Sequence, residues 1–211
     1  MRRYASAALL GLALLWGCSH SVLVPVPPRM ALDRYGTLGI VEFTSNAERG
    51  TSARATRQFQ EQVQGAQPGT PFLELGDRDS VLAAVGATQL DPAALRKIGE
   101  KYGVRAIFVG DLVYSAPLMD IKLPDVTRLE GGVRAEMRGD IASRLLDTAT
   151  GASVWSGSAW ARRQIGSVHV SAERGLSGGM SQSNPREEML PGMLYQLTHD
   201  FRPSSVRQQV R

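Results

Sequence analysis

The sequence of 211 residues has one cysteine and three histidines, and only 6% of its residues are aromatic. A single cysteine cannot form an intrachain disulfide, which excludes a disulfide-stapled miniprotein. His169 and His199 lie far apart with no companion at metal-ligand spacing, so we expect no metal site. The sequence also lacks both a phosphate-binding glycine-rich loop and the GxSxG pattern of a serine hydrolase. We therefore predict no catalytic residues, no cofactor and no enzymatic activity.

The remaining composition is that of a globular protein. Hydrophobic residues make up 43% and charged residues 21% of the chain, which excludes a fully disordered or collagen-like chain. A chain of this length can bury a substantial core without covalent cross-links. One domain of medium size is the natural expectation.

The first segment has the pattern of a bacterial signal sequence. Arg2 and Arg3 precede an uncharged run over residues 5–16. This run is too short for a membrane-spanning helix but suits the apolar region of a signal peptide. It ends in Leu15-Trp16-Gly17-Cys18, which resembles the lipobox of bacterial lipoproteins, although Trp16 is bulkier than usual there. We predict cleavage of residues 1–17 and lipidation of Cys18; the alternative is an ordinary signal peptide with a chance cysteine.

Processing of this kind changes the charge and the location of the protein. Loss of Arg2 and Arg3 would leave 22 of the 24 basic residues against 20 acidic ones, so the basis for a nucleic-acid partner disappears. Several acyl chains on one cysteine give strong membrane anchoring. Ser19 follows Cys18, and by resemblance to Gram-negative lipoproteins this favours the periplasmic face of the outer membrane.

The segments at either end of the predicted domain have little helical character. Residues 18–35 contain Val24-Pro25-Val26-Pro27-Pro28 and predict a short, semi-rigid tether; alternatively, part of this segment packs on the domain. The basic tail over residues 204–211 is expected to be frayed.

Between the tether and the tail, residues 36–203 alternate between strand and helix patterns. The apolar run at 37–43 predicts a buried strand, and residues 71–75 predict a second short strand. The nearly continuous apolar run at 105–113 predicts a central strand covered on both faces. Asp77 and Asp91-Pro92 predict the starts of two helices, and residues 48–66 predict another. Alternating residues over 133–145 and 152–163 predict an antiparallel hairpin, and a last helix follows around Pro191. We expect a single α/β domain with one mixed sheet flanked by helices.

The ordered set of segments resembles a periplasmic α/β domain shared by the curli-secretion lipoprotein CsgG, the penicillin-binding-protein activator LpoB and the amino-terminal domain of TolB. The resemblance covers about residues 36–165, and its main carriers are residues 38–43, 72–78, 98–112 and 142–156. It implies an envelope accessory lipoprotein that works by binding. The chain has little room for the membrane hairpins of the curli channel, and its tether is too short to cross peptidoglycan as in LpoB.

Two regions are candidate partner surfaces. The connection over residues 115–131 is long and apolar, which favours either a docking surface or a loop folded over the core; its candidate residues are Leu118, Met119, Ile121, Leu123 and Val126. On the hairpin, the charged residues Arg134, Glu136, Arg138 and Asp140 share one strand face, which is either solvated or a docking face.

These observations leave three functions open. The first is a non-enzymatic outer-membrane lipoprotein that binds an envelope protein or itself. The second is a subunit of an oligomeric secretion or pore assembly. The third is an envelope hydrolase with an unrecognised site, which would need convergent carboxylates such as Asp111 and Asp140 at strand ends.

Overall fold

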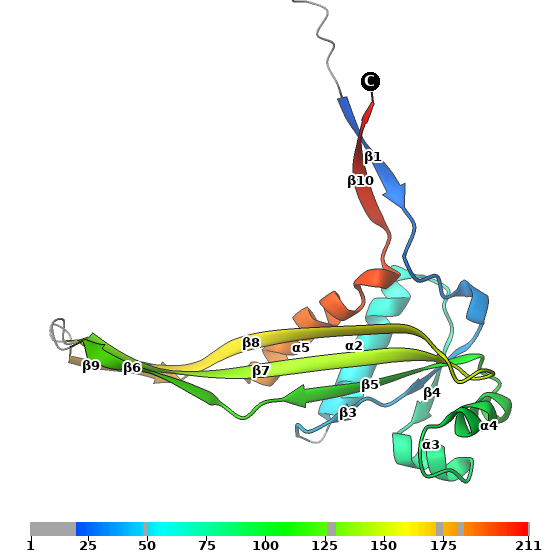
Figure 1. Cartoon of the computed structure of the whole chain (residues 1–211), viewed down its shortest axis with the longest axis horizontal. Coiled ribbons are helices and arrows are strands. Elements are labelled where there is room, and N and C mark those ends of the chain that lie inside the picture. The colour runs from blue at the N-terminus through cyan, green and yellow to red at the C-terminus, as the bar shows by residue number, and fades with distance from the viewer. Residues whose placement is uncertain (1–19, 49, 126–129, 172–174, 181–183, 211) are drawn as a thin grey trace, which may run out of the picture. The chain divides into compact units, whose positions relative to one another are not determined.

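The computed structural model describes residues 20–48, 50–125, 130–171, 175–180 and 184–210 (Figure 1). The chain divides into two compact units, one formed by the residues up to Pro28 and from Pro203 onward, the other by Arg29–Arg202. The first unit consists of β1 (His20–Val26) paired with β10 (Ser204–Val210). The second unit contains the predicted α/β domain.

A mixed β-sheet forms the centre of the second unit, as predicted. Its strands follow the order β4-β2-β5-β7-β8-β9, with β3 beside β5 and β6 beside β7. The strands β2, β4 and β5 are parallel, whereas β5, β7, β8 and β9 are successively antiparallel. Their bounds are β2 (Leu38–Val41), β3 (Thr44–Ser45), β4 (Phe72–Gly76), β5 (Ala106–Tyr114), β6 (Leu118–Asp125), β7 (Glu130–Asp147), β8 (Ser153–Ser171) and β9 (Gly175–Met180).

The helices begin where the sequence supplies caps. In α3 (Arg78–Ala84), the Asp77 carboxylate accepts a hydrogen bond of 2.9 Å from the Ser80 amide. In α4 (Pro92–Tyr102), the Asp91 carboxylate accepts one of 2.7 Å from the Ala94 amide. Such caps satisfy amides that have no partner within the helix. The other helices are α2 (Thr51–Ala66), α5 (Pro185–Leu197) and the short 3₁₀ turns η2 (Asp33–Tyr35) and η3 (His199–Phe201).

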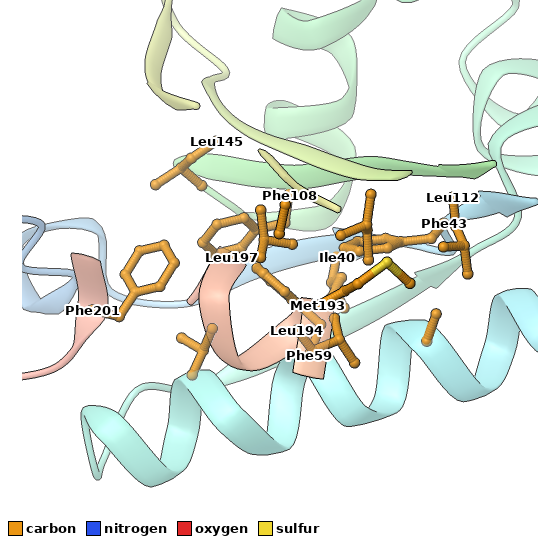
Figure 2. Close-up of a cluster of buried hydrophobic side chains, with 14 of the residues drawn as sticks. Ile40, Phe43, Phe59, Phe108, Leu112, Leu145, Met193, Leu194, Leu197 and Phe201 are labelled. Atoms are coloured by element: carbon orange, nitrogen blue, oxygen red, sulfur yellow. The ribbon is translucent and has the colours of Figure 1, made fainter. Parts of the chain in front are cut away.

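The larger core lies between one face of the sheet and the helices α2 and α5. Phe59 of α2, Met193 of α5 and Phe108 of β5 all belong to this core, and Figure 2 shows them in one cluster of buried side chains. The rings of Phe59 and Phe108 meet edge to face, with their centroids 5.1 Å apart. All three residues are fully buried, which places the main apolar stabilisation of the fold on this face.

A smaller core lies on the opposite face, under α3 and α4. Its buried members come from these helices and from the strands nearest to them: Val41, Val81, Leu95, Ile98, Val104, Ile107, Val109 and Leu146. This core covers β2 and the first half of β5, and β7 contributes only Leu146. The two helices therefore cover only part of this face.

Several local predictions differ from the structure. Residues 118–125 were expected within an irregular connection but form β6, which pairs with β7. Between the hairpin and the last helix, where no strand was expected, residues 175–180 form β9. Helix α5 starts at Pro185 with Asn184 as its cap, and Pro191 lies inside it. The residues expected as a frayed tail form β10, and much of the expected tether forms β1. Most of these differences follow from strand pairing, and the start of α5 follows from its cap.

Candidate interaction surface

The part of the sheet that α3 and α4 leave uncovered forms an exposed surface on β5, β7 and β8, which we call the open sheet face. The strand register places its residues in rows, with Val109 beside Arg144 and Ser156, Asp111 beside Ala142 and Ser158, and Val113 beside Asp140 and Trp160. The last row pairs Arg138 with Arg162. Opposed residues in neighbouring strands project to the same side. The members from Asp111 onward are wholly or partly exposed.

A polar cluster marks the border between the covered and the open part of this face. The Arg78 guanidinium, at the start of α3, lies 3.2 Å from the Asp111 carboxylate. The Thr44 hydroxyl of β3 also donates a hydrogen bond to Asp111. Asp111 is thereby held by a helix on one side and by a neighbouring strand on the other.

A shallow hollow of about 310 Å³ opens beside this cluster. Its lining includes Val109, Asp111 and Arg144 together with small residues such as Ala142 and Ser158. The surface is depressed at the border of the region that α3 and α4 cover, because the side chains there are small. The hollow can accommodate a side chain of a partner or a small polar group.

Trp160 is the most prominent apolar feature of the open sheet face. Its side chain is 54% exposed. The Arg138 guanidinium lies 5.1 Å and the Arg162 guanidinium 5.6 Å from the centre of its ring. Cations at this range are attracted to the face of the indole ring. An exposed tryptophan flanked by arginines has the composition typical of residues that dominate protein interfaces.

The carboxylates of this face are already engaged by basic side chains. Arg138 Nε lies 2.8 Å from Asp140 Oδ2, and the hydrogen bond to Asp140 raises the pKa of the Arg138 guanidinium. Asp111 has its own partner in Arg78. Asp111 and Asp140 thus share a face, but each forms an ion pair of its own and they do not form a proton-sharing pair. Across the described residues, no group of three His, Cys, Asp or Glu side chains could hold a metal ion.

The predicted partner residues of the 115–131 region are only partly described. Leu118 and Met119 lie on β6 and are 62% and 71% exposed. Ile121 and Leu123 also belong to β6. Val126 lies outside the described residues, as does Cys18. On the hairpin, Arg138 and Asp140 form their ion pair within one strand, rather than the cross-strand pair that a solvated face usually has.

The sequence alone did not single out Trp160. The alternation of β8 contained a signal for it. Trp155 and Trp160 are five positions apart, and side chains an odd number of positions apart on a strand project to opposite faces. Which tryptophan would be covered depended on where the helices pack.

No family model matches the sequence, and no curated protein matches it. Solved structures with a similar arrangement include the PelC dodecamer from Paraburkholderia phytofirmans, with 13% identity, a TM-score of 0.43, and 87% of this chain and 98% of that chain covered. A homolog of the neuraminyllactose-binding hemagglutinin from Helicobacter pylori has 7% identity, a TM-score of 0.46, and coverage of 81% and 85%. The LpoB C-terminal domain from Salmonella enterica has 12% identity, a TM-score of 0.35, and coverage of 60% and 82%.

LpoB is also one of the proteins in the resemblance expected from the sequence. At these identities the similarity concerns the arrangement of strands and helices alone. No helix among the described parts of the chain has the length and apolar character needed to cross a membrane.

Proposed function

We propose that this chain is an outer-membrane lipoprotein, anchored through Cys18, whose α/β unit acts as a non-enzymatic binding accessory of the cell envelope. The observation that carries the binding role is Trp160, exposed between two arginines on a sheet face that the helices leave open. The partner we infer is an envelope protein that docks on this face.

The anchoring part of the proposal is supported by the sequence. A positive start, an apolar run and Leu15-Trp16-Gly17-Cys18 follow each other in the order of a lipoprotein signal. Ser19 after the cysteine favours the outer membrane over retention in the inner membrane. Anchoring leaves the α/β unit on the periplasmic side, where the open sheet face is available to other envelope proteins.

The binding part is supported by the chemistry of the open sheet face. Arg78, Arg138, Arg144 and Arg162 outnumber the two acidic residues Asp111 and Asp140. Trp160 supplies apolar area in the middle of this basic surface. A partner with an apolar side chain surrounded by carboxylates would match both features. Leu118 and Met119 on β6 are a second candidate contact region.

A free strand edge favours self-association as a second candidate function. Within the described residues, the stretch of β8 from Ser153 to Gln164 pairs with β7 alone. Strand β9 pairs only with the last six residues of β8, which begin at Gly166. An unpaired edge can accept a strand from another chain. Head-to-tail pairing of copies would close into a ring, as expected for a subunit of a secretion or pore assembly.

Photo-cross-linking in native envelopes tests the docking face. A benzophenone amino acid replaces Trp160 in one variant and Tyr195 in a control. Tyr195 is also an exposed aromatic, 61% accessible, but lies on α5. We expect a discrete cross-linked partner from position 160 and none from position 195. Equal cross-linking from both positions, or none from position 160, would contradict the docking role.

Two further measurements test the anchor and separate the candidate functions. Cys18→Ser should release the protein from the membrane into the soluble fraction; a variant that still pellets with membranes would contradict the anchor. The mass of the detergent-solubilised protein then distinguishes an accessory from an assembly subunit. A defined ring of many copies would favour the second function, and a single copy bound to a different protein the first.

A further inference from the structure

The ribbon formed by β1 and β10 has two chemically different faces. Val24 lies opposite Val206, Val22 opposite Gln208 and Val26 opposite Ser204. Opposed residues of an antiparallel pair project to the same side, and successive residues alternate between sides. The valine face of the ribbon therefore consists of Val22, Val24, Val26 and Val206, together with Gln208 and Ser204.

The other face is more polar. It contains Ser21 opposite Gln209, Leu23 opposite Arg207 and Pro25 opposite Ser205. The sequence thus places four β-branched aliphatic residues on one side and the only described charge of the ribbon, Arg207, on the other.

The ribbon itself does not cover its valine face. Val22, Val24 and Val206 are 44%, 38% and 57% exposed. An isolated two-stranded ribbon is only marginally stable in water and needs a partner for its apolar side. The valine face therefore needs a partner beyond the ribbon itself for the ribbon to persist.

The position of the ribbon in the sequence indicates what covers it. Only Ser19 separates Cys18 from His20, the first residue of β1. At ~3.3 Å per residue, the ribbon begins within roughly 7 Å of the cysteine. If Cys18 carries acyl chains embedded in the membrane, the ribbon starts at the lipid surface.

The charge of these segments fits the same location. Residues 18–28 and 203–211 contain no aspartate or glutamate, whereas the second segment contains Arg207 and Arg211. Basic residues next to a membrane are attracted to anionic lipid headgroups. A ribbon without acidic residues meets no repulsion at that surface.

We propose that the β1–β10 ribbon is a second membrane-binding element, which lies in the lipid headgroup region with its valine face toward the acyl chains. The proposal rests on the proposed lipidation of Cys18. One acyl-bearing residue would otherwise allow the protein to rotate freely about its anchor. A ribbon bound along the surface fixes the first and last strands of the chain to the membrane together.

Spin labels on neighbouring residues of β10 test this proposal in the full lipidated chain. Val206→Cys places a label on the valine face, and Ser205→Cys places one on the polar face as the matched control. Because acylation blocks the thiol of Cys18, the introduced cysteine is the one that reacts with the label. The protein is reconstituted into vesicles of phosphatidylethanolamine and phosphatidylglycerol, and collisions of each label with oxygen and with a water-soluble nickel complex are measured.

We expect the ratio of oxygen to nickel collisions to be several-fold higher at position 206 than at position 205. Equal ratios, with both labels in water, would overturn the proposal. Spin–spin broadening at position 206 that disappears on dilution with unlabelled protein would also overturn it, because a second copy would then cover the valine face. Mass spectrometry of the same sample reports acylation. An acylated chain with a water-facing label contradicts only this inference, whereas an unacylated amino terminus contradicts the proposed function.

Discussion

Two tryptophans on one strand have opposite surroundings. Trp155 is buried, its indole Nε1 donates a hydrogen bond of 3.2 Å to Asp200 Oδ2, and its ring centroid lies 4.6 Å from that of Phe201. Trp160, five positions further along β8, is 54% exposed and flanked by Arg138 and Arg162. Strand alternation sends the two side chains to opposite faces of the sheet.

The two tryptophans differ in exposure because different helices pack over the two faces of the sheet. The face that contains Trp155 is covered by α2, α5 and η3. The opposite face is covered by α3 and α4 only as far as Val109 and Leu146. Trp155 therefore contributes to the folded state, and Trp160 remains available for binding. Mutations on the two faces of the same strand should separate stability from partner binding.

The largest expected effect is the loss of Trp155. Trp155→Ala should lower the free energy of unfolding by about 3–5 kcal/mol, because it leaves a cavity beside Phe108 and Phe201 and removes the hydrogen bond from the indole to Asp200. Trp160→Ala should lower it by only about 1 kcal/mol, the contribution of an exposed cation–π contact. Urea denaturation of both variants measures the difference. Similar losses in the two variants would refute the division of roles.

A glycine beside Trp155 sharpens the comparison. A Cβ atom added to Gly157 would lie 2.6 Å from Trp155 Cζ2. Gly157→Ala should therefore destabilise the fold by about 1–3 kcal/mol through overpacking.

Ser158→Ala is the matched control, because Ser158 follows Gly157 directly but lies on the open sheet face. It should be close to neutral in the same urea titration. A neutral Gly157→Ala would show that the Trp155 pocket is looser than the structure has it.

The sequence was sufficient to predict most strands and helices around the two cores. The continuous apolar run of β5 predicted a strand buried on both faces, which is confirmed as far as Gly110 but is wrong at Asp111 and Val113, which are exposed. Asp77 and Asp91 predicted the starts of α3 and α4. Alternation predicted β7 and β8. In each case the signal is local, since it depends on periodicity or on a cap within three residues.

The parts that differed depend on partners distant in sequence. The pairing of β1 with β10 joins the first and last segments of the described chain, and no local pattern specifies it. Pro25 within β1 argued against a strand, yet proline is tolerated at the edge of a two-stranded ribbon. In β6, the alternation of Met119, Ile121 and Leu123 with polar residues was present, but the length of the connection favoured a loop. β9 contains three glycines in Gly175–Met180, which weakens any strand signal.

For the candidate site, the sequence identified the charged row that includes Arg138 and Asp140 but not its relation to Trp160. That relation depends on the register of β7 against β8, which includes a shift between Ala135 and Glu136. A shift of one residue would place the charges on the other face, so the composition of the open sheet face could not be read from the sequence.

A pH-dependent prediction concerns Tyr114, at the end of β5 on the covered face. Its hydroxyl donates a hydrogen bond of 3.0 Å to the carbonyl of Arg186, and burial raises the pKa of Tyr114 to about 12. A raised pKa in the folded state means that this contribution to stability is complete below pH 10 and is lost as the pH rises toward 12.

Tyr114→Phe should therefore flatten the fall in stability between pH 10 and 12, and it should cost about 1 kcal/mol at neutral pH through the lost hydrogen bond. Tyr195→Phe, on an exposed tyrosine, should leave the alkaline slope as in the wild type. Denaturant titrations at several pH values provide the measurement. An unchanged slope in Tyr114→Phe would show that this hydroxyl does not control alkaline stability.

The smallest expected effect is the coupling between Arg138 and Trp160. Arg138 also forms an ion pair with Asp140, so the single variant Arg138→Ala mixes two losses. A double-mutant cycle with Arg138→Ala and Trp160→Ala isolates the contact between the guanidinium and the indole. We expect a coupling of about 0.5–1 kcal/mol, typical of an exposed cation–π pair. A coupling near zero would mean that Trp160 is not held by its arginines before a partner binds, and that the open sheet face becomes ordered only in the complex.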